Sequence, residues 1–324
     1  MHRSIRFGLG LLLCGLGACA PPPKSPPTTA ISDDGPIVVL GDTQRTLFAE
    51  SFFCGRERND VQSAALIGQL AREERPAFVV HLGDMVSVGD SSGEWEHFDQ
   101  LMQPLSERGV AIFPVFGNHD MWGNRRVALR NARKRFPELA HGAYAMRHHG
   151  LGLIWLDSNL EGLAGRRQAA WFEGVLRTFD GPGTRGVLVF MHHPVYTNGK
   201  HRHGSEYVIS ELLPHFFAAK KTLVLLSAHV HGYERFYARK RHFVVTGGAG
   251  GPRVEYAQGE QAPWVPATDR LPPGPRPFNY VVIHDRGSRL DFDVKCLKGA
   301  VDCPSGSLDQ FSVDLPKIKA AVTR

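Results

Sequence analysis

The sequence predicts an α/β fold in which two mixed β-sheets pack together between helices, a four-layer α/β/β/α sandwich. Three observations favour this fold. From Pro36 onward, short apolar runs alternate with segments of helical period. Polar residues follow the ends of those runs, where open α/β sheets build their sites. The length of 324 residues, 42% of them hydrophobic, allows one substantial core.

The first half of the folded part is predicted to form three strand–helix units, which imply parallel strands with covering helices. Each expected strand is short and apolar, and each expected helix has apolar residues at helical spacing. The expected strands are 37–40, 77–82 and 110–115, and the expected helices are 59–74, 94–106 and 125–136.

The second half is expected to supply the other sheet. Its predicted elements are an antiparallel pair of strands at 142–146 and 151–156, a helix at 168–179, a strand at 186–191, a helix at 206–219 and a strand at 223–226. Segments 243–246 and 279–284 are expected to continue this second sheet, with 290–294 behind it. The proline-rich stretch 252–277 is expected to be a surface loop near the site.

The start of the chain predicts an export signal and not a folded segment. A positive beginning and a short apolar core precede Leu16-Gly17-Ala18-Cys19, which resembles a bacterial lipobox. Cys19 is therefore expected to be lipidated and to hold the protein on a membrane of the bacterial cell envelope; the alternative is a secreted protein with an ordinary signal. The predicted division is a signal peptide at 1–19, a Pro-rich tether at 20–35, the folded domain at 36–295 and a C-terminal extension at 296–324.

The cysteine and charge content indicate which disulfide and which kinds of partner to expect. In an oxidising compartment, Cys296 and Cys303 are expected to close a small disulfide loop in the extension, whereas Cys54 is predicted to be a buried or free thiol. The formal charge of +6 is mild, and no basic stripe is interleaved with aromatic residues. Nucleic acid is therefore not indicated as a partner.

Five polar blocks carry the candidate chemistry, and each follows a hydrophobic run. They are G-D-T-Q at 41–44, G-D at 83–84, G-N-H-D at 117–120, M-H-H-P at 191–194 and A-H-V-H-G-Y-E-R at 228–235. A histidine pair alone is weak evidence for a metal. Together the blocks supply the carboxylate, amide and imidazole ligands that a pair of cations requires.

The five blocks resemble those of the calcineurin-like metallophosphoesterases, and the last two are closest to the purple acid phosphatase branch. The resemblance covers about 37–246 and implies the metallophosphoesterase sandwich. It implies two metal ions (Fe, Mn or Zn) and a small phosphorylated substrate, either a monoester or a diester. The implied reaction is in-line attack of metal-bound hydroxide on phosphorus, with a histidine assisting the leaving group.

The resemblance also assigns the ligands, with Asp84 bridging the two ions. Metal one would be held by Asp42, Asp84 and His231, and metal two by Asp84, Asn118, His192 and His229. His119 would lie over the substrate and assist the leaving oxygen, and Asp120 would orient its ring. The alternative for Asp120 is a helix N-cap. His201, Arg202 and His203 are candidates for contact with the substrate phosphate, against a solvated loop.

Two positions depart from the family pattern. Gln44 stands where many members have a histidine, and its amide either ligates metal one weakly or binds a metal-bound water. Ser87 stands where the purple branch has an iron-binding tyrosine, so a colourless enzyme is expected. These departures also keep open an alternative, a lipid-anchored envelope binding protein with little or no turnover. His193 is expected to be either structural or substrate-facing, and residues 233–235 to brace their loop.

Overall fold

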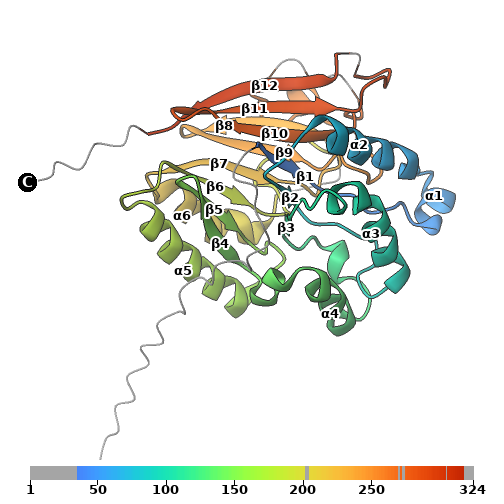
Figure 1. Ribbon diagram of the computed structural model, residues 1–324, viewed down its shortest axis with the longest axis horizontal. Helices are drawn as coiled ribbons and strands as arrows, with labels where there is room; N and C mark the ends of the chain where they lie inside the picture. Colours follow the sequence, from blue (N-terminus) through green and yellow to red (C-terminus); the bar gives the residue numbers. More distant parts are fainter. Residues whose placement is uncertain (1–34, 201–203, 269–270, 272–273, 304, 317–324) are drawn as a thin grey trace, which may run out of the picture.

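Two sheets lie face to face in the molecule, with helices packed on the outer side of each (Figure 1). The computed structural model describes residues 35–200, 204–268, 271, 274–303 and 305–316. The predicted α/β/β/α arrangement of two mixed sheets is confirmed. The signal peptide expected at 1–19 and nearly all of the expected tether lie outside the described residues. Within the described ranges, no helix has the length and apolar character that crossing a membrane requires.

The first sheet combines strands from both ends of the described chain. Its order is β12 (Ser307–Asp314), β11 (Arg289–Cys296), β10 (Asn279–Asp285), β1 (Ile37–Leu40), β2 (Phe78–His81) and β3 (Ile112–Pro114). Strands β1, β2 and β3 are parallel, and the other three extend the sheet antiparallel from β1. The helices of this half are α1 (Phe48–Cys54), α2 (Asp60–Glu73), α3 (Ser92–Ser106) and α4 (Arg125–Arg135).

The second sheet is built from the middle of the chain. Its order is β4 (Tyr144–His148), β5 (Leu151–Trp155), β6 (Gly186–Phe190), β7 (Thr222–Ser227), β9 (Arg241–Thr246) and β8 (Tyr233–Ala238). The inner four strands are parallel, and the edge strands β4 and β8 are antiparallel to their neighbours. Helices α5 (Gly162–Phe179) and α6 (Leu213–Ala218) pack in this half. Shorter helical turns lie at His119–Met121, Pro137–His141, Val208–Leu212 and Gly259–Gln261.

The central parallel strands are apolar along their whole length because both of their faces are covered. Strands β1, β6 and β7 are buried at every position. Helix α5 covers the second sheet with a stripe of apolar residues at helical spacing that includes Phe172 and Leu176. The central parallel strands are thus held firmly in the core, and the candidate site lies at their carboxyl ends.

One expectation about the topology was wrong. Segment 279–284 was expected to continue the second sheet, with 290–294 behind it, but β10 and β11 lie in the first sheet, where Val282 pairs with Val38 of β1. The sequence analysis also did not predict strand β8. Strand β8 forms an antiparallel hairpin with β9 and occupies an edge of the second sheet.

The C-terminal hairpin of β11 and β12 contains the expected disulfide. Cys296 and Cys303 are bonded, with their Cα atoms 6.2 Å apart. Strand β12 then pairs along most of β11. The predicted domain boundary at 295 therefore falls inside this hairpin, and residues 307–314 are part of the sandwich. Cys54 is a free thiol, and it is exposed.

The helix expected at 206–219 is interrupted. A π-helical turn at Val208–Leu212 precedes the short α6, which begins with Leu213-Pro214. Proline has no backbone N–H to donate to the preceding turn, so a regular α-helix cannot continue through Pro214.

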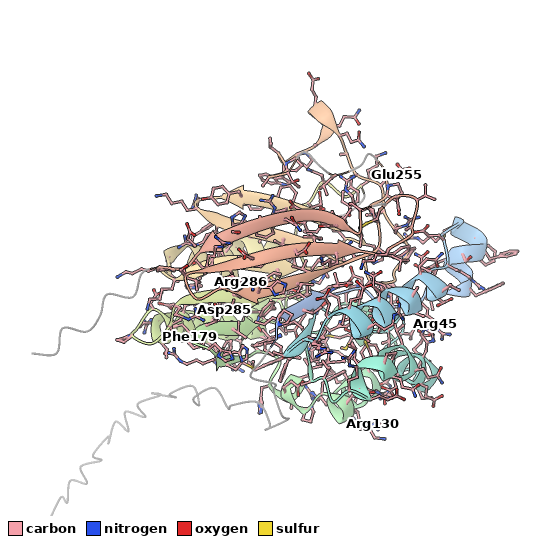
Figure 2. All side chains as sticks on the ribbon, turned by 45° about the horizontal axis from the view of Figure 1, so that its top comes forward. Arg45, Arg130, Phe179, Glu255, Asp285 and Arg286 are labelled. Atoms are coloured by element: carbon pink, nitrogen blue, oxygen red, sulfur yellow. A yellow bond between two sulfur atoms is a disulfide. The ribbon has the colours of Figure 1, made fainter. Side chains whose placement is uncertain are left out.

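An arginine links the two sheets at the end of the sandwich where β1 and β6 begin. Asp285, the last residue of β10, and Arg286, which follows it, lie there (Figure 2). Arg185 donates to the carbonyl of His149 (2.9 Å) and to that of Gly287 (2.8 Å), and it forms a salt bridge with Asp285. Because Arg185 precedes β6 and Asp285 ends β10, this contact links the two sheets.

Candidate metal centre

The candidate site lies at the carboxyl ends of β1, β2, β3, β6 and β7. Asp42, Asp84 and His229 follow three of these strands in the left-handed backbone region, with φ of 60°, 53° and 69°. Non-glycine residues rarely adopt this conformation, which costs about 1–3 kcal/mol and is concentrated at functional sites. The three tight turns therefore indicate that the position of these side chains matters more than local stability.

Asp42, Asp84 and His231 form one group of possible metal ligands. Their ligand atoms all lie within 4.8 Å of one another, and all three residues are buried. The Nε2 atom of His231 lies 4.0 Å from an oxygen of Asp42. The structure thus brings together the three residues predicted for metal one.

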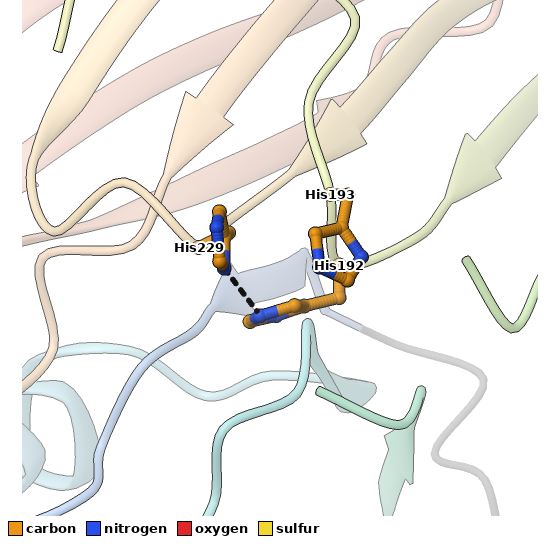
Figure 3. A group of neighbouring side chains, drawn as sticks. All are labelled: His192, His193 and His229. Carbon is orange, nitrogen blue, oxygen red and sulfur yellow. Dashed lines mark hydrogen bonds between the residues drawn. The ribbon is translucent and has the colours of Figure 1, made fainter. Parts of the chain in front are cut away.

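A second group contains His192, His193 and His229 (Figure 3), with ligand atoms again within 4.8 Å. The Nε2 atom of His192 lies 3.1 Å from Nδ1 of His229 and 3.1 Å from Oδ1 of Asn118. It also lies 3.4 Å from Oδ2 of Asp84. The residues predicted for metal two are therefore together, and Asp84 lies between the two groups, as a bridging carboxylate would.

Backbone carbonyls orient two of the imidazole rings. The Nδ1–H of His192 donates to the carbonyl of Leu82 at 2.9 Å, and that of His231 donates to the carbonyl of Pro252 at 2.7 Å. A carbonyl only accepts, so each ring carries a proton on Nδ1, and Nε2 is the nitrogen that could bind a metal ion once it is deprotonated. Metal-binding histidines are commonly fixed in this manner.

The buried carboxylates and imidazoles of the site shift one another's pKa values. Burial raises the pKa of Asp84, but His192 outweighs burial and holds that pKa well below its usual range. Burial lowers the pKa of His192, but Asp84 and Asp42 outweigh it and raise the pKa to about 9. The buried carboxylates thus strongly favour positive charge beside them, and bound cations would supply it.

The residues present fit a pair of metal ions. The buried amide oxygen of Gln44 has no hydrogen-bond partner among the described residues, while its nitrogen donates to Asp84 at 3.3 Å. A buried amide oxygen without a partner is costly unless a cation or a water satisfies it. Glycines leave room around the carboxylates, since a Cβ atom at Gly247 would lie 2.1 Å from Asp42. Carboxylate, amide and imidazole donors suit Fe, Mn or Zn.

The predicted hydrogen bond from the His119 ring to Asp120 was wrong. Its carboxylate accepts backbone N–H groups from Gly117 (2.8 Å), Asp84 (3.0 Å), Met85 (2.8 Å) and Val86 (3.2 Å), and it does not accept from the His119 ring. It is not a helix N-cap either, because Asn118 takes that position. Burial, reinforced by the charge of Asp84, raises the pKa of Asp120 to about 7. Asp120 therefore fixes the turn that carries Asp84.

His119 is oriented by two other contacts. Its Nδ1 lies 3.0 Å from the carbonyl oxygen of Ser87, and its ring centroid lies 3.8 Å from that of Trp122. The hydroxyl of Ser87 donates to the carbonyl of Arg45. The backbone N–H of His119 also donates to Asp84 at 2.8 Å, which places His119 directly beside the centre.

The last motif is braced as the sequence analysis expected. Tyr233 donates to Asp309 of β12 at 2.8 Å, and Arg235 donates to the same carboxylate at 2.7 Å. Glu234 accepts from the hydroxyl of Thr197 at 2.6 Å. These three side chains therefore support the loop and lie outside both groups of ligands.

Sequence reasoning left the position of His193 open, and it did not identify the residues around it. His193 lies in the second group, and its Nδ1 is 2.9 Å from the hydroxyl of Ser158. The only sequence signal was its place next to His192 in M-H-H-P. The predicted substrate contacts His201, Arg202 and His203 lie outside the described residues.

Several proteins resemble this chain in sequence. Purple acid phosphatase 21 of Arabidopsis thaliana is 24% identical over 220 residues, which are 63% of this chain and 50% of that protein. Purple acid phosphatase 22 of the same plant is 22% identical over 223 residues, covering 66% of this chain and 47% of that protein. The chain thus spans about half the length of the curated relatives it matches.

Solved structures share the fold at low identity. A purple acid phosphatase from yellow lupin (Lupinus luteus) seeds superimposes with a TM-score of 0.66 at 16% identity, covering 86% of this chain and 53% of that one. GAP50 of Plasmodium gives 0.62 at 15% identity, with 88% and 90% covered. A dimetal phosphatase from Danio rerio gives 0.56 at 15% identity, with 87% and 100% covered.

The family assignment follows from a match over more than half of the chain. The calcineurin-like phosphoesterase family matches residues 35–233, a range that contains every predicted metal ligand. The similarity to purple acid phosphatases agrees with the branch that the motifs indicated. The chain belongs to the calcineurin-like phosphoesterase family.

Proposed function

We propose that this chain hydrolyses phosphate esters at a centre that holds two metal ions. One observation carries the proposal. Two groups of possible ligand atoms, each within 4.8 Å, meet at the carboxylate of Asp84; the first group is fully buried, and the second is buried at His192 and partly buried at His193 and His229. One group would hold metal one through Asp42, Asp84 and His231. The other would hold metal two through Asp84, Asn118, His192 and His229.

The metal ions and the protein residues would have different roles in the reaction. Two bound cations supply positive charge for the phosphoryl oxygens and lower the pKa of a water molecule. Two divalent ions carry more positive charge than Asp42 and Asp84 offset, so the loaded centre attracts an anionic phosphate. Asp120 keeps the Asp84 turn in place through its four backbone contacts.

His119 is the proposed proton donor to the leaving oxygen. The Ser87 carbonyl holds its Nδ1, and Trp122 packs against its ring, so Nε2 is the nitrogen available to a substrate. When the bond between phosphorus and the leaving oxygen breaks, a proton from Nε2 would neutralise the alkoxide. Substitution of His119 should lower turnover and leave the bound metals in place.

The test compares Asp84→Asn with the natural protein. Both are loaded with Mn²⁺, Zn²⁺ or Fe²⁺, and hydrolysis of p-nitrophenyl phosphate and of bis-p-nitrophenyl phosphate is measured together with metal content. The variant should lose both metal and activity, whereas Asp314→Asn, which removes an exposed carboxylate, should retain both. The ranking of the two substrates distinguishes a monoesterase from a diesterase.

A binding protein that keeps the fold is the second candidate. Gln44 and Ser87 replace family residues at metal one, and GAP50 of Plasmodium, which shares the fold, is described as the anchor in the inner membrane complex. If the natural protein holds its metals and hydrolyses neither ester, this candidate replaces the first.

We also propose attachment to the cell envelope through lipidated Cys19. The lipobox-like Leu16–Cys19 and the proline-rich 20–35 support this placement. In a bacterial host, Cys19→Ser should move the protein from the membrane fraction to the soluble fraction. If Cys19→Ser stays in the membrane fraction to the same extent, the lipid anchor is refuted.

A further inference from the structure

A polar cavity of about 590 Å³ adjoins the second group of ligands. Its walls come from the loop after β5, from the beginning of α5 and from the segment that leads into the π-helical turn. His193 is part of both the cavity wall and the second ligand group. The cavity and the metal centre therefore meet at this side chain.

His193 is held in a defined position. Its backbone N–H donates to the hydroxyl of Ser158 at 2.9 Å, and its Nδ1 lies 2.9 Å from the same oxygen. Its ring centroid lies 4.5 Å from that of His229. A substrate whose phosphate lies on the centre would thus have this cavity within reach of its alcohol portion.

The described wall of the cavity carries acidic side chains, in contrast to a metal-loaded centre. Glu161, Glu206 and Glu211 line it, and none of the other described residues in its wall is lysine or arginine. None of the three carboxylates forms a salt bridge within the described part of the chain. Hydroxyl groups of Ser158 and Ser210 also line the wall.

We infer that this cavity receives the alcohol portion of the substrate and favours an alcohol that carries a positively charged amine. This inference rests on the proposed function, because it assigns the phosphate to the metal centre. A phosphate ester of an amino alcohol has a negative phosphate and a positive ammonium group. The phosphate would face the positively charged metal centre, and the ammonium group would face the three carboxylates. An ammonium group has three donors for such acceptors, whereas a carboxylate on the alcohol would be repelled.

The test compares two esters of nearly equal size. O-phosphoethanolamine and ethyl phosphate are assayed with the metal-loaded protein, and the ratio of their kcat/KM values is the readout. Exposed ion pairs each change such a ratio by about 1.4- to 5-fold, so three carboxylates should give about a tenfold preference for the amine. In Glu161→Gln/Glu206→Gln/Glu211→Gln the ratio should fall close to one, and high salt should lower it in the natural protein.

A matched control removes the same charge elsewhere. Glu107, Glu173 and Glu260 are exposed and do not line the cavity, so their triple change to glutamine should leave the ratio as it is. A natural ratio near one, or an equal fall in both triple variants, overturns the inference.

A binding measurement separates this inference from the proposed function. Saturation-transfer NMR, which detects weak ligands, compares ethanolamine with ethanol on the natural protein and on both triple variants. If the natural protein hydrolyses no ester and still binds ethanolamine through the three glutamates, the proposed reaction fails and the amine site stands. If ethanolamine binds no better than ethanol, the amine site fails, whatever the enzyme hydrolyses.

Discussion

The two ends of the sandwich use their polar groups in opposite ways. At the end where β1 and β6 begin, Arg185 satisfies the carbonyls of His149 and Gly287 and the carboxylate of Asp285. At the other end, the Gln44 oxygen lacks a partner among the described residues, and Asp84 occupies a costly left-handed turn. The comparison indicates that one end serves stability and the other serves a ligand, and substitutions at the two ends should separate these effects.

The largest expected effect is on metal binding at the ligand end. His231→Ala should lower activity more than about 100-fold, since loss of outer partners alone costs about 10–100-fold in metal proteins. Metal content should fall, and Zn²⁺ should raise Tm less than it does in the natural protein, because a ligand stabilises the folded state that binds it. His141→Ala, at an exposed histidine, is the control. An unchanged metal content in His231→Ala would remove that residue from the centre.

Asp120→Asn should have the next largest effect, and it should act on both metal binding and stability. The amide would place N–H groups against the backbone N–H groups that the carboxylate now accepts. Activity should fall about 10–100-fold, and the free energy of unfolding of the metal-free protein should drop by about 1–3 kcal/mol. Denaturant unfolding and titration with Zn²⁺ measure the two effects. If only turnover fell, Asp120 would contact substrate.

Arg185→Met should show the reverse pattern. It removes the donor to the His149 and Gly287 carbonyls and the ion pair with Asp285. Because these partners are exposed to water, the unfolding free energy should fall by about 0.2–1 kcal/mol. Since Arg185 lies at the far end from the ligands, kcat and metal affinity should not change. A drop in kcat comparable with that of Asp120→Asn would contradict the division between the two ends.

The last prediction concerns a pH dependence of stability at Glu234, in the last motif. Burial raises the pKa of Glu234 to about 7, against hydrogen bonds from Thr197 and Asn198 that lower it. Its folded pKa exceeds its unfolded pKa, so the folded state binds more protons between about pH 4.5 and 7. Stability should therefore decrease as the pH rises through this window, by at most about 1.4 kcal/mol per pH unit. Glu234→Gln should remove this slope in thermal unfolding scans.

The sequence predicted the ligand end better than the sheet order. Ligands such as Asp42 and Asp84 directly follow buried apolar strands, so local pattern and motif spacing were sufficient to place them together. Strand β8 has no clear apolar run, and the position of β10 rests on its pairing with β1, a segment far away in the sequence. The partners of Asp120 are backbone N–H groups, which residue types do not reveal.

The contacts of Asp309 have a consequence for how the protein matures. All the predicted metal ligands precede residue 232, yet Tyr233 and Arg235, which follow the last two of them, depend on a carboxylate in β12 near the end of the described chain. During synthesis, the imidazoles and carboxylates therefore exist well before the strand that steadies them. We therefore expect metal binding to become stable only after β12 has been made and has joined the first sheet, late in the synthesis of each molecule.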